Sequence, residues 1–294
     1  MLEFLPTEDV KILENEPLSR HSSMKTGGPA AVAAFPKNTG ALIKLIRAAE
    51  EQEVRHVVVG NASNILFDDR GFGGLVIFTT GLRGIYWGED TVRAECGASL
   101  TALSGKAAER GLSGLEFAYG IPGTVGGAVY MNAGAYGGEM KDVLTTVQYL
   151  TAEGEIKEAV AAELDLRYRH SIFEENGGCI LSAQFALTPG EPEAIRTKMD
   201  ELMAKRLDKQ PLDKPSAGST FKRPVGAFAA ALIDQCGLRG YRHGGAAVSE
   251  KHCGFVVNLG GATCADVLAL CEEVRAIVKE KTGYDLEKEI RVVR

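Results

Sequence analysis

Nine of the thirty residues between Gly111 and Met140 are glycine, and this stretch, GLSGLEFAYGIPGTVGGAVYMNAGAYGGEM, constrains the fold more than any other. Glycine at this density predicts that no helix forms there, because glycine loses more conformational freedom in a helix than other residues do. The stretch lacks lysine and arginine, but its glycines expose backbone N–H groups to a ligand. We therefore expect a cradle for a cofactor diphosphate. A set of tight turns in a β-rich domain is the alternative, and glycine density alone leaves both open.

A second loop of small polar residues, GNASN at 60–64, follows the apolar run VRHVVV at 54–59. A strand that ends in such a loop offers short side chains and open backbone amides at one place, which suits an anion. Neither stretch has the spacing GxGxxG before a helix or GxxxxGK[ST], which are typical of Rossmann and P-loop proteins. The two loops therefore indicate a different phosphate-binding scaffold.

The composition limits the class of protein. The chain has 294 residues, 45% of them hydrophobic, which is enough for two or three domains. Its net charge of −6 argues against a general binder of nucleic acid or membranes, because both need a basic surface. Six cysteines without a CxxC pair predict reduced thiols, and five scattered histidines predict no metal site. The acidic N-terminus and the lack of a long apolar run lead us to expect a cytoplasmic protein.

The first two thirds of the chain alternate between strands and helices. An apolar strand ends at Pro36, Thr39 caps an amphipathic helix, and 54–59 forms the next strand, so a βαβ unit is expected. Beyond residue 70 the strands are short and separated by glycines, and the runs at 143–150 and 179–187 predict antiparallel pairing in an α+β lobe.

The C-terminal third begins with a helix at 191–208, and two prolines in 209–215 predict a domain boundary after it. Beyond this boundary we expect a helix at 227–236 closed by Gly237, a helix capped by Thr263 and Asp266, and a strand at 289–293.

Residues 203–223 carry six basic and two acidic side chains, a local charge of +4 in an acidic chain. Such a cluster predicts a site for a small polyanion such as a nucleotide diphosphate. The alternative is a solvated helix end with scattered surface lysines. Lys222 is the strongest candidate because it lies within a glycine-serine turn.

Three positions could take part in acid–base or charge-stabilising chemistry. Ser219, in the turn AGST, could protonate a substrate carbanion, although the residues alone favour a turn serine that bonds its own backbone. Arg169, in RYRHSIF, could hold a carboxylate or form a surface salt bridge, and Arg167 lies on the same side if this run is extended. Glu287 and Glu289 share one face of a strand, either as acid–base groups or as ordinary edge charges.

Three further segments accompany the two loops: YRHSIF at 168–173, AGSTFK at 217–222 and LEKEIR at 286–291. Together with GNASN and GIPGTVGGAVYMNAGAYGGE, they resemble the UDP-N-acetylenolpyruvoylglucosamine reductase family, also called UDP-N-acetylmuramate dehydrogenases. The resemblance keeps the order of the motifs and spans nearly the whole chain.

The resemblance implies an α+β fold with a two-lobed FAD-binding domain of the vanillyl-alcohol oxidase type and a smaller α+β substrate-binding domain. It implies a first FAD-binding lobe at 1–70, joined by the C-terminal strand 286–294. The second lobe would occupy 71–200 and the substrate-binding domain 201–285.

In the family that this chain resembles, NADPH reduces bound FAD, and a hydride then reaches the terminal vinyl carbon of the enolpyruvyl ether of a UDP-sugar. The resemblance implies that Arg169 and Glu289 stabilise the resulting aci-carboxylate and that Ser219 protonates it, giving UDP-N-acetylmuramate for peptidoglycan synthesis. It implies FAD as cofactor, NADPH as co-substrate and a UDP-sugar as partner. We expect no nucleic-acid or membrane partner, and a monomer or weak oligomer.

The resemblance also implies binding residues. For FAD these are Gly60, Asn61, Ala62, Ser63, Asn64, Gly120, Ile121, Pro122, Gly123, Thr124, Gly126, Gly127, Ala128, Asn132, Gly134 and Ala135. For the substrate they are Lys222, Tyr168 and Ser171.

The chain departs from the family pattern at three places. Asn61-Ala62 stands where a second glycine is common, and Arg223 stands where asparagine is usual. Only fifty residues separate Arg169 from Ser219, too few for the tyrosine-bearing insertion that one branch folds over its substrate, so we expect the branch without it. Two rival functions are another FAD oxidoreductase of this fold, acting on an alcohol or hydroxy acid, and a flavin-free UDP-sugar-binding regulator.

Overall fold

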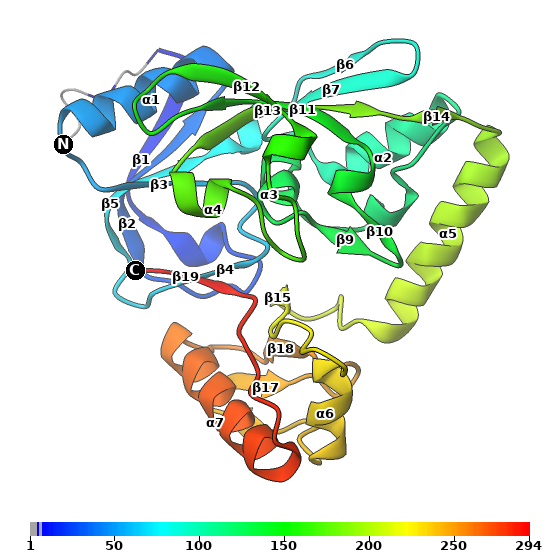
Figure 1. The fold of residues 1–294 in the computed structure, drawn as a ribbon. Coiled ribbons are helices and arrows are strands. Elements are labelled where there is room, and N and C mark those ends of the chain that lie inside the picture. The colour runs from blue at the N-terminus through cyan, green and yellow to red at the C-terminus, as the bar shows by residue number, and fades with distance from the viewer. Residues whose placement is uncertain (1–4, 6–7) are drawn as a thin grey trace. The chain divides into compact units, whose positions relative to one another are not determined.

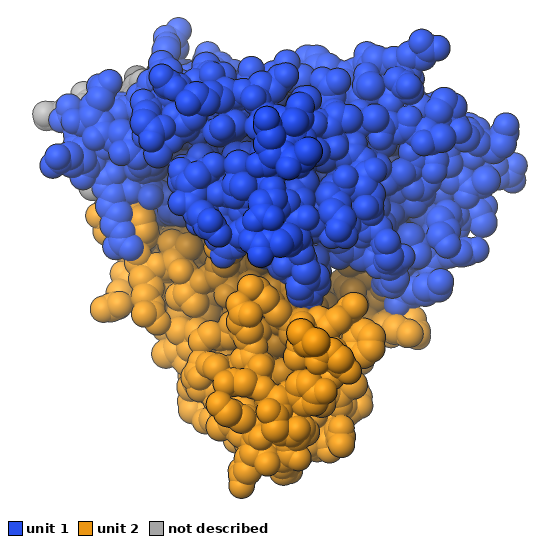
Figure 2. Space-filling view, viewed as in Figure 1, with its two compact units in different colours: residues 1–13, 32–61, 74–205 blue, residues 14–31, 62–73, 206–294 orange. Residues whose placement is uncertain are grey.

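Segments that are far apart in the sequence come together in each of two units of the chain (Figure 2). The computed structural model describes residue 5 and residues 8–294. Unit 1 comprises residues 1–13, 32–61 and 74–205, and unit 2 comprises residues 14–31, 62–73 and 206–294. The expected domain boundaries at residues 70, 200 and 285 stay a prediction, and residues 1–4, 6 and 7 of the first expected lobe lie outside the described residues.

The N-terminal part of the chain forms a four-stranded sheet in the order β1-β2-β5-β3. The strands are β1 (Val10–Pro17), β2 (Pro29–Pro36), β3 (His56–Val59) and β5 (Phe72–Phe78), and helix α1 (Thr39–Glu51) connects β2 to β3. The two strands of the expected βαβ unit are β2 and β3. Strand β5 lies between them in the sheet, and β3 runs parallel to β5. The predicted cap is wrong by one residue, because the side chain of Asn38, not Thr39, accepts the N–H of Ala41.

Unit 1 also contains a five-stranded sheet whose neighbouring strands are all antiparallel, which confirms the expected pairing. In order, its strands are β12 (Ile156–Val160), β11 (Leu144–Leu150), β13 (Cys179–Ala186), β7 (Thr91–Glu95) and β6 (Ile85–Trp87). Leu103, Val147 and Phe185 are fully buried in the core of unit 1. Burial of a side chain of this size contributes about 1.5–3 kcal/mol to folding.

The longer helices begin and end close to where the sequence predicts. Ser99 caps α2 (Leu100–Glu109) by accepting the N–H of Ala102, and Gly111 follows with φ +67°. Helix α5 (Pro192–Lys209) begins with the expected proline. No helix in the described part of the chain is both long and apolar enough to cross a membrane.

Unit 1 also contains the short helix α4 (Phe173–Asn176) and two short paired strands, β8 (Leu112–Ser113) and β14 (Thr188–Pro189).

Unit 2 contains a second four-stranded sheet, and Figure 1 shows α6 and α7 beside its strands β17 and β18. Helix α7 begins with the predicted capping box of Thr263 and Asp266. Gly237 follows α6 with φ +76°, as expected for a helix end. The elements are β15 (Ser216–Ser219), β18 (Phe255–Asn258), β17 (Ala246–Val248), β16 (Arg242–His243), α6 (Ala229–Gln235), α7 (Cys264–Thr282), and the parallel pair β4 (Ile65–Phe67) and β19 (Arg291–Val293).

Candidate active site

The two glycine loops contact each other within unit 1. The Asn61 side chain donates a hydrogen bond to the carbonyl of Pro122 at 2.8 Å. Gly60 lies so close to Thr124 that a Cβ at position 60 would come within 2.2 Å of the Thr124 hydroxyl oxygen. Position 60 therefore requires glycine because a side chain would push the loops apart.

The glycine-rich stretch contains a short helix, so the prediction that no helix forms there is wrong for α3 (Val125–Tyr130). The Thr124 hydroxyl caps α3 by accepting the N–H of Gly127. Gly126 packs against Cys96, and an added Cβ would come within 2.8 Å of the Cys96 Cβ. Glycine is therefore needed inside α3 for close packing, which offsets its low helix propensity.

The end of the same stretch is a tight hairpin, as the alternative interpretation of its glycines expected. Strands β9 (Gly134–Ala135) and β10 (Gly138–Glu139) pair antiparallel. The two residues between them, Tyr136 and Gly137, have φ angles of +54° and +92°. Part of the glycine density is therefore explained by backbone geometry alone.

The first backbone amides of α3 are used by the protein itself. The N–H of Val125 donates to the carbonyl of Ala98 at 2.9 Å, and the N–H of Gly126 donates to the carbonyl of Cys96 at 2.8 Å. The predicted contact of Gly126 with a diphosphate therefore cannot use its N–H group.

Open amides occur instead in the first loop. Among the described residues, none accepts a hydrogen bond from the backbone N–H groups of Gly60, Asn61, Ala62 or Ser63. Four successive N–H groups in a loop without basic side chains suit an anion, since each of these donors can bond to a ligand acceptor. These residues therefore fit the diphosphate of FAD, and the other predicted FAD contacts stay predictions.

Ala62 has a left-handed backbone, with φ +46°, and is buried. This conformation costs a residue with a Cβ about 1–2 kcal/mol. Ala62 therefore has a backbone conformation that glycine adopts more readily.

Arg169 lies in a tight turn and not in an extended strand. The N–H groups of Arg167 and His170 donate to each other's carbonyl at 3.3 and 3.2 Å, and Arg169 has φ +55°. The run is therefore not extended, so the condition under which Arg167 and Arg169 would share one side is not met. Arg167 pairs with Asp165 at 2.6 Å, and this hydrogen bond lowers the pKa of Asp165.

The guanidinium of Arg169 contacts the glycine-rich stretch. Its Nη2 donates to the carbonyl of Gly134 at 3.4 Å, and the group lies 5.1 Å from the centre of the exposed Tyr168 ring. Ser171 is fully buried, and its hydroxyl donates to the carbonyl of Tyr130 at 2.7 Å. The hydroxyl proton of Ser171 is therefore used to support the turn, and the predicted contact of Ser171 with substrate stays a prediction.

In unit 2 the chain brings Ser219 and Glu289 onto adjacent segments. The N–H of Glu289 donates to the carbonyl of Thr220 at 2.8 Å, and Phe221 and Lys288 form an antiparallel bridge. Two of the three predicted catalytic residues therefore lie on adjacent segments, where Glu289 faces Thr220, the residue after Ser219. The third, Arg169, belongs to unit 1.

Ser219 ends β15 after an irregularity at Gly218, which has φ +76°. Within residues 8–294, no group forms a hydrogen bond with the Ser219 hydroxyl. The adjacent Thr220 holds the turn instead, because its hydroxyl accepts the N–H of Val256 at 2.9 Å. The interpretation of Ser219 as a turn serine bonded to its own backbone is therefore wrong. The sequence analysis did not single out Thr220, and no local pattern marks it.

Glu287 and Glu289 differ in exposure, although both were candidates. The Glu287 side chain is 71% exposed and pairs with Lys222 at 2.6 Å, whereas Glu289 is only 9% exposed. Burial therefore selects Glu289, in agreement with the resemblance. Lys222 already has a carboxylate partner, so a substrate phosphate at Lys222 would share the ammonium group with Glu287 or displace it.

The basic cluster at 203–223 is partly used for folding. Arg206 is buried and donates to the Gln210 side chain at 3.3 Å. Arg223 stacks on Phe228, with 4.7 Å between its guanidinium carbon and the ring centre. The expected binding of a substrate diphosphate by this cluster stays a prediction.

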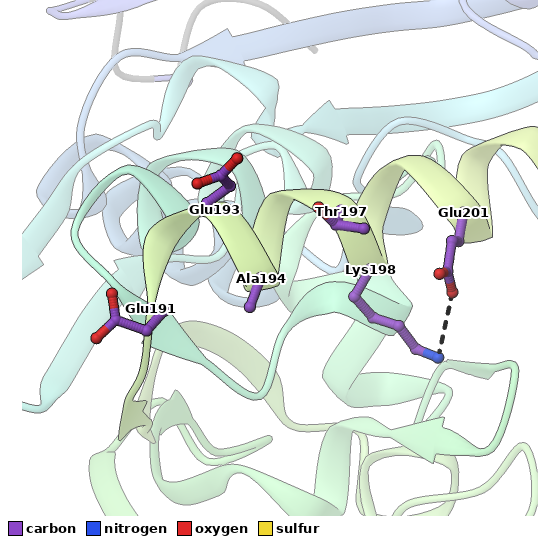
Figure 3. Close-up of a pocket in the computed structure, with 6 residues that line it drawn as sticks. All are labelled: Glu191, Glu193, Ala194, Thr197, Lys198 and Glu201. Carbon is purple, nitrogen blue, oxygen red and sulfur yellow. Dashed lines mark ion pairs between the residues drawn. The ribbon is translucent and has the colours of Figure 1, made fainter.

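A depression on the protein surface follows one face of α5 (Figure 3). A single helix and the residue before it supply its whole lining, and Lys198 pairs there with Glu201 at 3.7 Å. Since no second element encloses this surface and three carboxylates line it, it does not suit a nucleotide diphosphate. The lining residues are Glu191, Glu193, Ala194, Thr197, Lys198 and Glu201.

Comparison with known proteins identifies the class first. The model of the FAD binding domain family matches residues 29–159. A solvent-stable cholesterol oxidase of known structure shares the fold over 64% of this chain and 39% of its own, with a TM-score of 0.50 and 13% identity. The chain is therefore an FAD-binding oxidoreductase with a two-lobed FAD domain of the vanillyl-alcohol oxidase type, followed by a smaller α+β domain.

The family follows from closer relatives. The model of the UDP-N-acetylenolpyruvoylglucosamine reductase C-terminal domain matches residues 210–293. Proteins named UDP-N-acetylenolpyruvoylglucosamine reductase are 48% identical in Levilactobacillus brevis (97% of this chain, 93% of the relative) and 50% identical in Agathobacter rectalis (96% and 94%). The crystal structure of the enzyme of this name from Thermus caldophilus matches with a TM-score of 0.82 and 34% identity, over 97% of this chain and 99% of its own. The chain belongs to the UDP-N-acetylenolpyruvoylglucosamine reductase family.

Proposed function

We propose that this protein uses NADPH to reduce the enolpyruvyl ether of UDP-N-acetylglucosamine enolpyruvate to UDP-N-acetylmuramate, a step of peptidoglycan precursor synthesis. The observation that supports the proposal is the ladder between the segment that follows Ser219 and the segment that carries Glu289, in a chain about half identical to reductases of this name. A UDP-sugar and NADPH would then be its small-molecule partners. A cytoplasmic location and a monomer or weak oligomer belong to the same proposal.

The open amides of Gly60 to Ser63 would hold the FAD diphosphate, and FAD when bound supplies the hydride chemistry that amino-acid side chains lack. The small residues of the loop leave space for the ligand to approach the backbone. Asn61 supports the loop from the other side, through its hydrogen bond to the carbonyl of Pro122.

Three side chains would act on the substrate. The Arg169 guanidinium would bind the substrate carboxylate and stabilise the negative charge that develops on it. The carboxyl group of Glu289, buried at the ladder, would share in stabilising this charge. The Ser219 hydroxyl, which has no partner among the described residues, would donate a proton to the carbon next to the carboxylate.

Purified protein tests the proposal when it is mixed with NADPH and the enolpyruvyl UDP-sugar while nicotinamide oxidation is followed at 340 nm. We expect a yellow protein with flavin absorbance, and NADPH oxidation that depends on the UDP-sugar. Omission of the UDP-sugar in the absence of oxygen is the control. NADPH oxidation at the same rate with and without the UDP-sugar would refute the proposal.

The same purified protein, mixed with an alcohol or hydroxy acid in place of NADPH, or with the UDP-sugar alone, separates the rival functions. Flavin reduction by an alcohol or hydroxy acid, with reoxidation by oxygen, would indicate another oxidoreductase of this fold. A colourless protein that still binds the UDP-sugar would indicate a flavin-free regulator.

A further inference from the structure

Asn132 is the most completely enclosed polar side chain of the glycine-rich stretch. It is 0% exposed and has a left-handed backbone with φ +37°. Its side-chain amide donates to Glu139 Oε2 at 2.7 Å and to the carbonyl of Arg167 at 3.1 Å, and its Oδ1 accepts the N–H of Lys141 at 3.0 Å. Both amide protons are therefore used within the protein, which leaves no side-chain donor for the cofactor contact expected at this position.

Arg167, whose carbonyl accepts the hydrogen bond from Asn132, is the first residue of the turn that carries Arg169. The same carbonyl accepts the N–H of His170 at 3.2 Å, and this bond closes the turn. Ser171 ties the other end of the turn to the carbonyl of Tyr130. The turn is thus anchored at both ends to residues of the glycine-rich stretch.

Arg169 needs this support because of its backbone conformation. With φ +55° it occupies a region that residues with a Cβ rarely adopt, and such conformations persist where the surroundings hold them. If the turn relaxed, the guanidinium would leave its position at the carbonyl of Gly134.

We infer that Asn132 is a positioning residue for Arg169: its amide holds the Arg167 carbonyl and thereby fixes the turn that aims the Arg169 guanidinium. The inference rests on the proposed function of Arg169 in binding the substrate carboxylate. Glu139 fixes the orientation of the amide by accepting its other proton, and Lys141 pairs with the second oxygen of Glu139 at 2.6 Å.

This geometry explains why an amide rather than a carboxylate stands at position 132. An aspartate there would have the same size and would also tolerate a left-handed backbone. Its second oxygen, however, would face Glu139 Oε2 and the Arg167 carbonyl, both of which are acceptors. Asn132→Asp therefore turns two attractive contacts into repulsive ones without changing the volume of the side chain.

The test uses the FAD-loaded enzyme and follows the two half-reactions separately by stopped flow. For Asn132→Asp we expect the enol ether to reoxidise the reduced enzyme about 10²-fold more slowly, the cost of a reactive group displaced by about 1 Å. NADPH should still reduce the flavin at the wild-type rate. The double variant with Arg169→Ala should be no slower than Arg169→Ala alone, because both changes remove the same function.

A second measurement does not depend on turnover. In protein labelled with ¹⁵N-arginine, the Nε–H signal of Arg169 is assigned by its loss in Arg169→Ala. We expect this signal to shift in Asn132→Asp. Asn132→Gly tolerates φ +37° but lacks the side-chain amide, so it should shift the Arg169 signal as well. This variant replaces Asn132→Asp in the test if the aspartate variant does not fold.

Asn258→Asp is the matched control. Asn258 is also buried, at 6% exposure, and its amide donates to the carbonyl of Met24 while its Oδ1 accepts the N–H groups of Gly260 and Ala262. It lies in unit 2, whereas the Arg169 turn belongs to unit 1, and these hydrogen-bond partners are all residues of unit 2. We expect a similar loss of stability, an unshifted Arg169 signal and unchanged half-reactions.

Failure of the inference and failure of the proposed function give different results. If Arg169→Ala is slow but Asn132→Asp reacts at the wild-type rate with an unshifted Arg169 signal, only the inference is refuted. If Asn132→Asp slows both half-reactions equally, the inference is also refuted, because the residue then acts on the whole domain. A full rate of reoxidation in Arg169→Ala would refute the proposed function of Arg169 and, with it, the inference.

Discussion

The side-chain amide of Asn64 donates a hydrogen bond to the main-chain carbonyl of Glu289 at 3.2 Å, although 225 positions separate the two residues. In return, the N–H of Arg291 donates to the carbonyl of Asn64 at 3.0 Å. The end of the first glycine loop therefore fixes the segment before β19, which carries the predicted catalytic glutamate. Since Glu289 also bonds to Thr220, one network connects Asn64 to the segment of Ser219.

Asn64→Ala should loosen this network. We expect the free energy of unfolding to fall by about 0.5–1.5 kcal/mol, the usual contribution of one hydrogen bond. We also expect slower reduction of the enol ether, because the carboxyl group of Glu289 loses its fixed position. Urea unfolding followed by fluorescence checks the first effect. A variant with wild-type stability and wild-type turnover would contradict both.

Ser219→Ala should keep the flavin and its reduction by NADPH but slow the reduction of the enol ether by about 10²–10⁴-fold, the usual contribution of a positioned proton donor. Stopped-flow measurement of both half-reactions checks this. Ser216→Ala, in the same strand β15, is the control and should behave as the wild type. Equal loss in both half-reactions would show that Ser219 is not the proton donor.

Asp69→Ala should destabilise unit 2. The two oxygens of Asp69 accept the N–H groups of Cys264 and Ala265 at 2.6 and 2.9 Å, so this carboxylate satisfies two free amides at the start of α7. Loss of a helix cap usually lowers the free energy of unfolding by about 0.5–2 kcal/mol. Glu280→Ala removes an exposed carboxylate from the other end of α7 and should not destabilise, since negative charge is unfavourable there. Equal effects in the two variants would argue against the cap.

Asp266 predicts a dependence of stability on acid pH. Its Oδ2 accepts the N–H groups of Thr263 and Gly245, and these bonds lower its pKa below the usual 3.8. Because the folded protein binds this proton more weakly than the unfolded chain, Asp266 stabilises the fold above pH 3.8. The stabilisation is lost as the pH falls through the lowered pKa. In Asp266→Asn, the decline of unfolding free energy below pH 4 should be shallower than in the wild type. Parallel curves for the two proteins would contradict the assignment.

The thiols should be unreactive in the native protein. No disulfide forms among the described residues, and five of the six free cysteines are buried, whereas Cys179 is half-buried. Burial raises the pKa of Cys271 to about 12 and that of Cys264 to about 11, so both stay protonated at pH 8. We expect Ellman's reagent at pH 8 to modify at most one thiol in native protein, and six in guanidinium. If Cys179→Ser abolishes the single modification of native protein, Cys179 is the reactive thiol. Rapid modification of several thiols would contradict the burial of the other five.

Local sequence patterns predicted the elements well where the stabilising contacts lie within a few residues. The caps at Ser99 and Thr263 and the glycine after α2 depend on bonds to neighbours three or four positions away, so they are visible in the sequence. Helix α3 is not visible in the sequence because the packing that requires Gly126 is against Cys96, which lies thirty positions earlier.

The candidate site was only partly visible in the sequence. Motif resemblance implied Ser219, Arg169 and Glu289 as catalytic residues and Ser171 as a substrate-binding residue, but it did not show that the Ser171 hydroxyl donates to the carbonyl of Tyr130. Whether a polar side chain is free or used depends on which distant group lies beside it. Spacing along the chain does not report that.

The sequence by itself determined the family, the α+β class and the positions of most helices and strands, because periodicity, caps and glycine spacing act over short distances along the chain. Only the tertiary structure decided which amides stay open in the first loop, which of Glu287 and Glu289 is buried, and which residue supports the Arg169 turn. The physical reason is that hydrogen bonding and burial are properties of neighbours in space. Such neighbours, like Asn64 and Glu289, can be hundreds of residues apart in the chain.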